Sequence, residues 1–218
     1  MKTDPERFIR ANTALGPVPL VGGICLFMAN EAHELWHKTE DELDEMGLPP
    51  PFWAFAWAGG QALARYVLDH PDLVAGQRVV DFGAGSGLVG IAALKAGAAE
   101  VTAIDIDPWS AIAIGLNAAE NGVRLTIRND DAIGQFPDAD VLLAGDVFYD
   151  SGLARRIIPW FQALAERGIT VLAGDPHRRY RPAGEADMLD VIDVPVSRAL
   201  EDADVKATAI LRFRPANR

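Results

Sequence analysis

Cysteine is nearly absent from this sequence of 218 residues, because Cys25 is the only one. A lone cysteine excludes an internal disulfide, and its apolar setting in GGICLFM is typical of a buried thiol rather than a nucleophile. No apolar run approaches the ~18 residues that a membrane-spanning helix requires. The first residues, MKTDPERFIR, carry acids early and have no apolar core, so we expect neither a secretory signal nor a transit peptide. These absences predict a soluble, cytoplasmic protein with no membrane partner.

Basic residues are also scarce: 20 lysines and arginines stand against 31 acids, which leaves a formal charge of -11. A nucleic acid would be repelled by this charge, and we expect no nucleic-acid partner. The one local basic cluster, HRRYRP at 177–182, is more typical of a solvated surface or an intramolecular ion-pair donor than of an RNA contact. A cationic partner fits the charge better.

A change in character near Gly76 divides the chain, since an irregular front section gives way to alternating strands and helices. We expect one domain over 1–218, with an N-terminal helical appendage at 1–60 and a core at 61–218. The appendage is predicted to hold a helix at about 4–13, a strand at ICLFM and an acidic helix at about 31–46.

The core pattern predicts a parallel sheet. Apolar strands alternate with helices of about 10 to 15 residues, which indicates βαβ units. The strands are expected at RVVDF, EVTAIDI, RLTIRN, DVLLAG and ITVLAGD. The tail VKATAILRFR alternates strictly, as a half-buried antiparallel strand would. The pattern therefore predicts a doubly wound α/β fold.

The segment VVDFGAGSGLVG joins the first of these strands to its helix. Glycines 83, 85 and 87 let the backbone turn sharply and approach a ligand. Because Gly85, Gly87 and Gly90 also satisfy G-x-G-x-x-G, a nicotinamide or flavin dinucleotide is a real alternative. Asp81 just before the loop would oppose a diphosphate and attract the ammonium and sulfonium of S-adenosylmethionine. Charge therefore favours S-adenosylmethionine.

Further carboxylates follow the next strands. Asp105 ends AIDID and is placed to accept both hydroxyls of a ribose, while Asp107 is the expected N-cap of the helix that opens at Pro108. After the third strand, Asp130 and Asp131 are both candidates to accept the adenine amino group, with a slight preference for Asp131. These residues indicate an adenosine ligand without indicating a reaction.

The fourth strand ends in AGDVFYD, beside the switch point where open α/β sheets bind ligands. Asp146 and Tyr149 would face the transferred methyl group, and a carboxylate with a phenol suits an amine. We expect Asp146 to orient the amine while the proton leaves through water, because a carboxylate near its ordinary pKa is a poor acceptor from ammonium. The alternative is that Asp146 caps the following helix and Tyr149 only packs.

Together, VVDFGAGSG, AIDID and AGDVFYD resemble the class I S-adenosylmethionine-dependent methyltransferases. PPFWAFAWAGGQALARYVL and the D-x-x-Y element from Asp146 to Tyr149 are similar to the family 16 protein methyltransferases, in particular the lysine methyltransferases of the electron-transfer-flavoprotein beta subunit. The similarity covers roughly residues 24 to 214. It implies a seven-stranded Rossmann-like sheet with the last strand antiparallel, S-adenosyl-L-methionine as cofactor, and a lysine of that subunit as substrate.

The aromatic run PPPFWAFAW precedes the glycine loop. In similar proteins a tryptophan at the position of Trp57 borders the cofactor, so Trp57 is assigned to the site. Phe52, Trp53 and Phe55 are expected mainly in the core or the pocket wall. The predicted catalytic residues are Asp146 and Tyr149. The predicted cofactor-binding residues are Trp57, Asp81, Gly83, Gly85, Ser86, Gly87, Asp105, Ile106, Asp131 and Ala144.

A different reaction class is suggested by HELWH at 33–37, a literal H-E-x-x-H zinc motif. On a helical wheel both histidines fall opposite the apolar stripe, which is typical of a solvated face, so we expect no metal. The remaining alternatives are methylation of a ribosomal protein or a small amine, and a cofactor-binding module without turnover.

Overall fold

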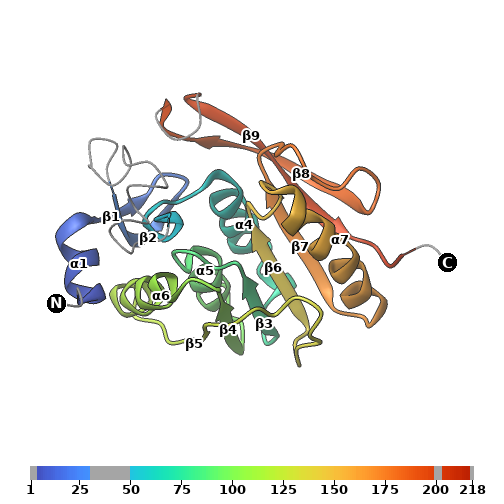
Figure 1. Cartoon of the computed structure of the whole chain (residues 1–218), viewed down its shortest axis with the longest axis horizontal. Helices are drawn as coiled ribbons and strands as arrows, with labels where there is room; N and C mark the ends of the chain where they lie inside the picture. The colour runs from blue at the N-terminus through green and yellow to red at the C-terminus, as the bar shows by residue number, and fades with distance from the viewer. Residues whose placement is uncertain (1–3, 30–49, 199–202, 217–218) are drawn as a thin grey trace.

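The computed structural model describes residues 4–29, 50–198 and 203–216 (Figure 1). Its centre is a seven-stranded sheet with the order β5-β4-β3-β6-β7-β9-β8. The strands are β3 (Arg78–Phe82), β4 (Glu100–Ile104), β5 (Thr126–Arg128), β6 (Val141–Gly145), β7 (Thr170–Asp175), β8 (Ala186–Pro195) and β9 (Val205–Phe213). Neighbours pair in parallel except β9, which is antiparallel to both β7 and β8. The predicted mostly parallel sheet with an antiparallel last strand is confirmed.

Two details of the last strands differ from the sequence pattern. The edge strand β8 was not among the predicted strands. Most of its residues are exposed, and its pairing register with β9 shifts between Met188 and Asp190. The tail strand β9 is not half-buried, since Thr208 and Ile210 are buried as well as Ala209 and Leu211. Both faces of the middle of β9, from Thr208 to Leu211, are covered, which its alternating sequence could not indicate.

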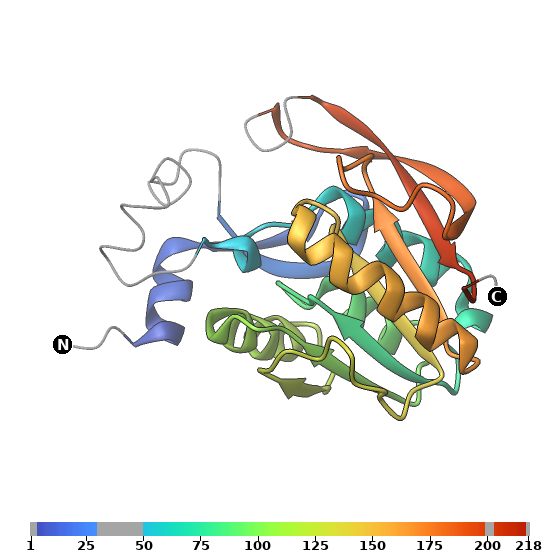
Figure 2. The ribbon, with the colours of Figure 1, turned by 45° about the vertical axis from the view of Figure 1, so that its right-hand side comes forward.

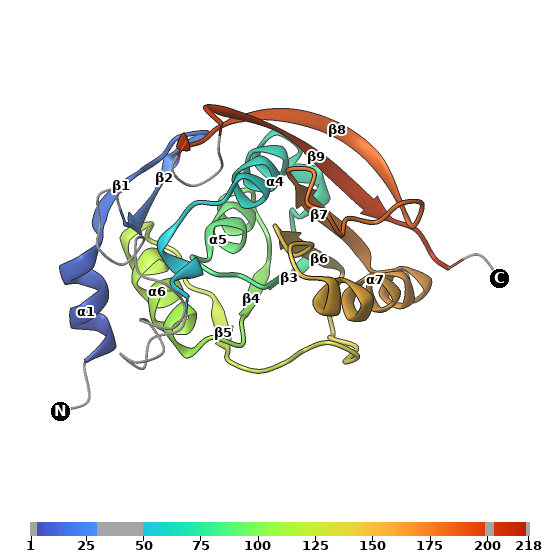
Figure 3. The same cartoon turned by 45° about the horizontal axis from the view of Figure 1, so that its top comes forward.

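The two faces of the sheet are covered by different helices (Figure 3). On one face α4 (Ala58–Asp69) and α5 (Leu88–Lys95) form a core with strand residues such as Val79 and Leu143. On the other face α7 (Ser151–Glu166) packs on the alternate strand residues, among them Val80 and Phe82. The period-2 alternation of strand side chains therefore supplies two separate cores. The helix α6 (Pro108–Glu120) lies next to α5.

The front section packs against these helices (Figure 2). It consists of α1 (Pro5–Asn12), the antiparallel pair β1 (Ala14–Val18) and β2 (Val21–Met28), and the short 3-10 turn η1 (Phe52–Ala54). A second 3-10 turn, η2 (Pro71–Leu73), follows α4 outside the front section. The predicted first helix and the strand at ICLFM are confirmed. The strand β1 was not predicted because its sequence, ALGPV, contains a glycine and a proline, which are rare in strands.

Two asparagines at the C-terminal end of α6, Asn117 and the C-cap Asn121, tie β2 to the core. The backbone N–H groups of Cys25 and Phe27 donate to the side chains of Asn121 and Asn117, over 3.1 and 2.8 Å. Asn117 is fully buried and also donates to the carbonyl oxygen of Ser86 at 2.8 Å, so it links the front section to the glycine loop. The front section is therefore part of the support of the site.

Some motifs are not covered by the structure. The HELWH motif and the acidic helix predicted at about 31–46 lie outside the described residues. Within 4–29, 50–198 and 203–216 the structure has no group of three His, Cys, Asp or Glu side chains that could hold a metal ion. In the same ranges, every helix is too short or too polar to cross a membrane.

Three glycines, Gly59 in α4, Gly145 in β6 and Gly174 in β7, bring α4 unusually close to the sheet. A Cβ on Gly59 would lie 2.3 Å from the carbonyl oxygen of Gly174 in β7, and a Cβ on Gly145 in β6 would lie 2.8 Å from the backbone of Gly60. Real side chains do not tolerate such distances. The first turn of α4 therefore rests directly on the carboxyl ends of β6 and β7, which only glycine permits.

This contact predicts opposite outcomes for two adjacent substitutions. Gly59→Ala should lower the free energy of unfolding by about 2 kcal/mol or more, because backbone atoms must move apart. Gly60→Ala should be neutral or stabilising by up to about 1 kcal/mol, since its Cβ would make ordinary contacts of 4.0 Å with Leu88 and Val89 and alanine favours helix. Urea denaturation of both variants measures the difference. Equal losses would mean that α4 is not held against the strands in this way.

Candidate functional site

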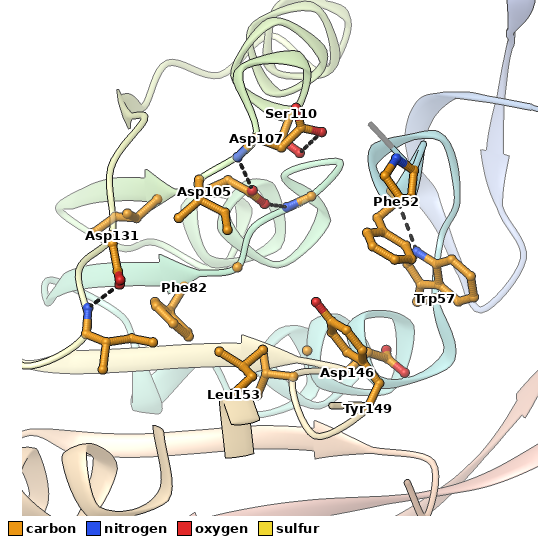
Figure 4. Close-up of a pocket in the computed structure, with 18 of the residues that line it drawn as sticks. Phe52, Trp57, Phe82, Asp105, Asp107, Ser110, Asp131, Asp146, Tyr149 and Leu153 are labelled. Carbon is orange, nitrogen blue, oxygen red and sulfur yellow. Dashed lines mark hydrogen bonds between the residues drawn. The ribbon is translucent and has the colours of Figure 1, made fainter. Parts of the chain in front are cut away.

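A pocket of about 520 Å³ opens at the carboxyl ends of β3, β4 and β6 (Figure 4). The chain reverses its direction of strand addition between β3 and β6, and ligands of open α/β sheets bind at such switch points. The volume is typical of a small-molecule site. The lining residues are Pro50, Phe52, Trp57, Phe82, Gly83, Gly85, Ile104, Asp105, Ile106, Asp107, Ser110, Asp130, Asp131, Ile133, Gly145, Asp146, Val147, Tyr149, Leu153, Arg156 and Arg178.

The glycine loop forms one wall of the pocket. Gly83, Gly85 and Gly87 have φ angles of 63°, 51° and 80°, in the left-handed region that glycine adopts without strain. Gly83 and Gly85 line the pocket, whereas Gly87 is the N-cap of α5 and faces Ile114. The turn therefore needs all three glycines, but only the first two border the cavity.

Asp105 holds the loop in place. Its Oδ2 accepts a hydrogen bond from the N–H of Gly85 at 2.8 Å, and its Oδ1 accepts one from the N–H of Asp107 at 2.9 Å. Burial raises the pKa of this carboxyl, and the backbone donors oppose that rise. Each oxygen keeps a lone pair, so the group remains able to accept ribose hydroxyls. Ile106, which is 73% exposed, forms the adjoining rim.

Asp81 is placed differently from the prediction. Its side chain is 1% exposed, does not line the pocket, and accepts the N–H of Gly90 in α5 at 2.8 Å. Burial raises its pKa to about 7. Strand alternation turns Asp81 away from the side of Val80 and Phe82 and under α5, so this carboxylate does not line the pocket where it was expected to contact a cofactor cation.

Two other predicted cofactor contacts are also behind the pocket wall. Ser86 is buried and its carbonyl oxygen accepts the amide of Asn117. Ala144 is fully buried in the core beneath α7. Neither residue lines the cavity, because the chain turns them inward at those positions.

Both candidates for the adenine contact do line the pocket. Asp131 accepts the N–H of Ile133 at 3.0 Å and pairs with Arg156 at 2.6 Å. Asp130 pairs with Arg128. In each case the arginine lowers the pKa of the carboxyl. The slight preference for Asp131 over Asp130 stays a prediction.

Asp146 lies at the opposite side of the pocket from Asp105 (Figure 4). Its Oδ2 accepts the N–H of Gly60 at 3.0 Å, and its Oδ1 accepts Nη2 of Arg178 at 2.8 Å. Gly60 lies in the first turn of α4, so the glycine contacts place a helix N-terminus at this carboxylate. Asp146 does not cap α7, because that position is held by Asp150, which accepts the N–H of Leu153. The alternative interpretation of Asp146 as a cap is wrong.

Three aromatic rings border the same end of the pocket. The ring of Phe52 lies 5.7 Å from that of Tyr149 and 6.1 Å from that of Trp57, between centroids. Trp57 Nε1 donates to the carbonyl oxygen of Phe52 at 2.9 Å. Partial burial and the charges of Asp105 and Asp150 raise the pKa of Tyr149, so its phenol is protonated at neutral pH.

The aromatic run therefore divides into two groups. Trp53 and Phe55 are buried in the core, where Trp53 stacks on Trp109. Phe52 is 47% exposed and stands at the pocket, so it belongs to the wall rather than the core. Sequence alone could not separate them, because the short turn η1 breaks the simple alternation of the run.

Arg178 is a charged lining residue that the sequence did not assign to the site. It lies in the basic cluster at 177–182, for which an intramolecular ion pair was one expectation, and its pairing with Asp146 confirms that expectation. The two residues are 32 positions apart. No spacing rule connects such positions, so only the adjacency of β6 and β7 could reveal the pair.

Comparison with known proteins agrees with this geometry. The family model described as Ribosomal protein L11 methyltransferase (PrmA) matches residues 61–147. The electron transfer flavoprotein beta subunit lysine methyltransferase of Xenopus laevis is 37% identical over 179 residues, covering 81% of this chain and 72% of that protein. The zebrafish (Danio rerio) protein of the same description is 46% identical over 133 residues, covering 60% of this chain and 52% of its own length.

A structural neighbour completes the comparison. The magnesium protoporphyrin IX methyltransferase of Synechocystis PCC 6803, solved with bound SAM, matches with a TM-score of 0.52 at 16% identity, covering 71% of this chain and 77% of that one. The fold is that of the Rossmann-like class I methyltransferases. The chain belongs to the electron transfer flavoprotein beta subunit lysine methyltransferase family. It spans about half the length of the zebrafish relative.

Proposed function

We propose that this protein is an S-adenosylmethionine-dependent protein-lysine N-methyltransferase that acts on the beta subunit of electron transfer flavoprotein. One observation carries the proposal. A single pocket has the Asp105 carboxylate beside the glycine loop at one side and the Asp146 carboxylate among three aromatic rings at the other. The side with Asp105 suits the adenosine of the cofactor, and the side with Asp146 suits the amine of the substrate.

The residues present fit the cofactor. The pocket lining contains five aspartates, Asp105, Asp107, Asp130, Asp131 and Asp146, against the two arginines Arg156 and Arg178. This excess of negative charge favours a cationic ligand over a dinucleotide diphosphate. When bound, S-adenosylmethionine supplies a methyl group on a sulfonium, which passes to the amine lone pair as the carbon–sulfur bond breaks and its electrons remain on sulfur.

The chain's own residues would align the amine for this displacement. The rings of Phe52, Trp57 and Tyr149 suit the methylene stem of a lysine and can attract its ammonium through their π faces. Asp146 orients the nitrogen, and the proton leaves to water before attack, because only the neutral amine has a free lone pair. Much of the rate gain then comes from positioning.

Two observations bear on the substrate. Relatives that share the family are named for the electron transfer flavoprotein beta subunit, and a net charge of -11 suits a lysine-bearing surface. The family-model match favours ribosomal protein L11 as the second candidate.

A labelling experiment separates these candidates. The enzyme is incubated with radiolabelled S-adenosylmethionine and either purified flavoprotein beta subunit or purified ribosomal protein L11, and the labelled residues are identified by mass spectrometry. We expect label on lysines of the flavoprotein subunit and little on L11. Label on L11 alone would replace the proposed substrate. No label on either protein would contradict protein-lysine methylation by this chain.

A further inference from the structure

The loop after β7 is folded back onto the end of β6. The N–H of Arg178 donates to the carboxylate of Asp175 at 3.2 and 3.3 Å, and the N–H of Tyr180 donates to the carbonyl oxygen of Phe148 at 3.3 Å. His177 has a φ of 60°, which turns the chain so that Arg178 points toward Asp146. The fold therefore specifies the position of Arg178.

Backbone strain is concentrated at the same contact. Among the described residues other than glycine, only Asp146, with a φ of 57°, and His177 have positive φ angles. Such conformations cost on the order of 1 kcal/mol or more and persist where the surroundings hold them. Here they bring together the carboxylate and the guanidinium that line one side of the pocket.

The surroundings of Asp146 offset its negative charge. Its side chain is 11% exposed and that of Arg178 24%, so little water screens their ion pair. The N-terminal end of α4 contributes a second positive pole through the N–H of Gly60. The guanidinium also lies 6.0 Å from the ring centroid of Trp57, which places it at the aromatic wall.

An unpaired carboxylate would hinder the proposed reaction. A carboxylate next to a lysine stabilises its ammonium form and raises its pKa, whereas a nearby cation has the opposite effect. Methyl transfer requires the neutral amine. A carboxylate that orients the nitrogen must therefore be kept from holding its proton.

We propose that Arg178 is a positioning residue for methyl transfer: it holds Asp146 and offsets its charge, so that the substrate amine binds there and still gives up its proton. The inference rests on the proposed function and adds a residue to it. Arg178 acts through Asp146, and the proton goes to water as before.

Other charged and titratable groups lie near Asp146 and Arg178. The 3-10 turn η1 and the first turn of α4 carry no acidic side chain. The titratable or charged groups on the surrounding loops include Tyr149 and Asp150 after β6, Asp175, His177, Arg179, Tyr180 and Arg181 after β7, and Asp105 across the pocket. All of them are common to the variants below, so a difference between variants reports on position 178.

The test measures kcat and KM for the flavoprotein subunit over a range of pH in the wild type, Arg178→Met and Arg178→Lys. In Arg178→Met we expect kcat at about pH 7.5 to fall about tenfold, because the pKa of the bound amine would be about one unit higher and one tenth as much of it would be neutral. KM should be unchanged or lower. The apparent pKa of the kcat profile should be about one unit higher in Arg178→Met than in the wild type, and the deficit should shrink as the pH rises past the wild-type value. Arg178→Lys should keep the wild-type pH profile because it keeps the charge.

Folding and cofactor binding serve as controls. Thermal unfolding and calorimetry with S-adenosylmethionine should give similar values for all three proteins, and Arg178→Gln replaces Arg178→Met if that variant does not fold. An apparent pKa of the kcat profile that is the same in Arg178→Met as in the wild type, or an unchanged kcat in Arg178→Met, would overturn the role of Arg178 while leaving lysine methylation intact. A wild type that labels no lysine would instead refute the proposed function, and this inference with it.

Discussion

Replacing Asp146 with asparagine should lower the rate of methyl transfer by about a hundredfold or more, the scale of one well-placed catalytic group. The carboxylate offers both oxygens to donors, one to Gly60 and one to Arg178. Asparagine has a single acceptor oxygen, and its NH₂ group would oppose one of these donors. The substrate amine then loses its orienting group, and Arg178 loses its counter-ion.

The measurement is single-turnover methyl transfer with saturating cofactor, together with calorimetry of cofactor binding. Because Asp105 and Asp146 lie on opposite sides of the pocket, the affinity for S-adenosylmethionine should change by only a few-fold, which is less than about 1 kcal/mol. Asp150→Asn is the matched control, since asparagine caps a helix as well as aspartate does. Unchanged transfer in Asp146→Asn would remove Asp146 from the mechanism.

Replacing Asp105 with alanine should abolish detectable binding of S-adenosylmethionine. The carboxylate is expected to accept two ribose hydroxyls, and each hydrogen bond to a charged group contributes about 1.5–3 kcal/mol, so the affinity should fall by at least about a hundredfold. The change also removes the acceptor for the N–H of Gly85, which releases the glycine loop. Both effects act on the cofactor side of the pocket.

Calorimetry of the variant with S-adenosylmethionine and with S-adenosylhomocysteine measures this loss, and circular dichroism checks that the sheet is intact. Asp69→Ala serves as the control, because Asp69 is an exposed carboxylate at the far end of α4, paired with Arg65. Tight binding of NAD by the wild type would contradict the assignment of the pocket. Retained cofactor affinity in Asp105→Ala would mean that the ribose lies elsewhere.

Much of the fold could be predicted from local sequence. Apolar strands separated by helices of regular length specify a parallel sheet, and the glycines at 83, 85 and 87 specify a tight turn at the end of its first strand. Asp107 before Pro108 is a local N-cap signal, and its carboxylate does accept the N–H of Trp109. These features depend on neighbours in the chain, which is why they can be read without the tertiary structure.

The edge strand β8 and the first strand β1 could not be predicted in this way. Strand β8 has exposed and acidic residues and a register shift, and strand β1 contains Gly16 and Pro17. Both become strands because a partner strand offers a row of backbone hydrogen bonds. Strand formation at such positions is decided by context rather than by propensity.

The sequence by itself was enough to identify four side chains that line one pocket, Asp105, Asp146, Trp57 and Tyr149. Only the tertiary structure decided how they are used. It turns Asp81 under α5, leaves Phe52 at the pocket wall, and pairs Asp146 with Arg178 from the loop after β7. The reason is physical. Side-chain direction and long-range pairing follow from how strands and helices pack, and residues far apart in sequence meet only when the sheet forms.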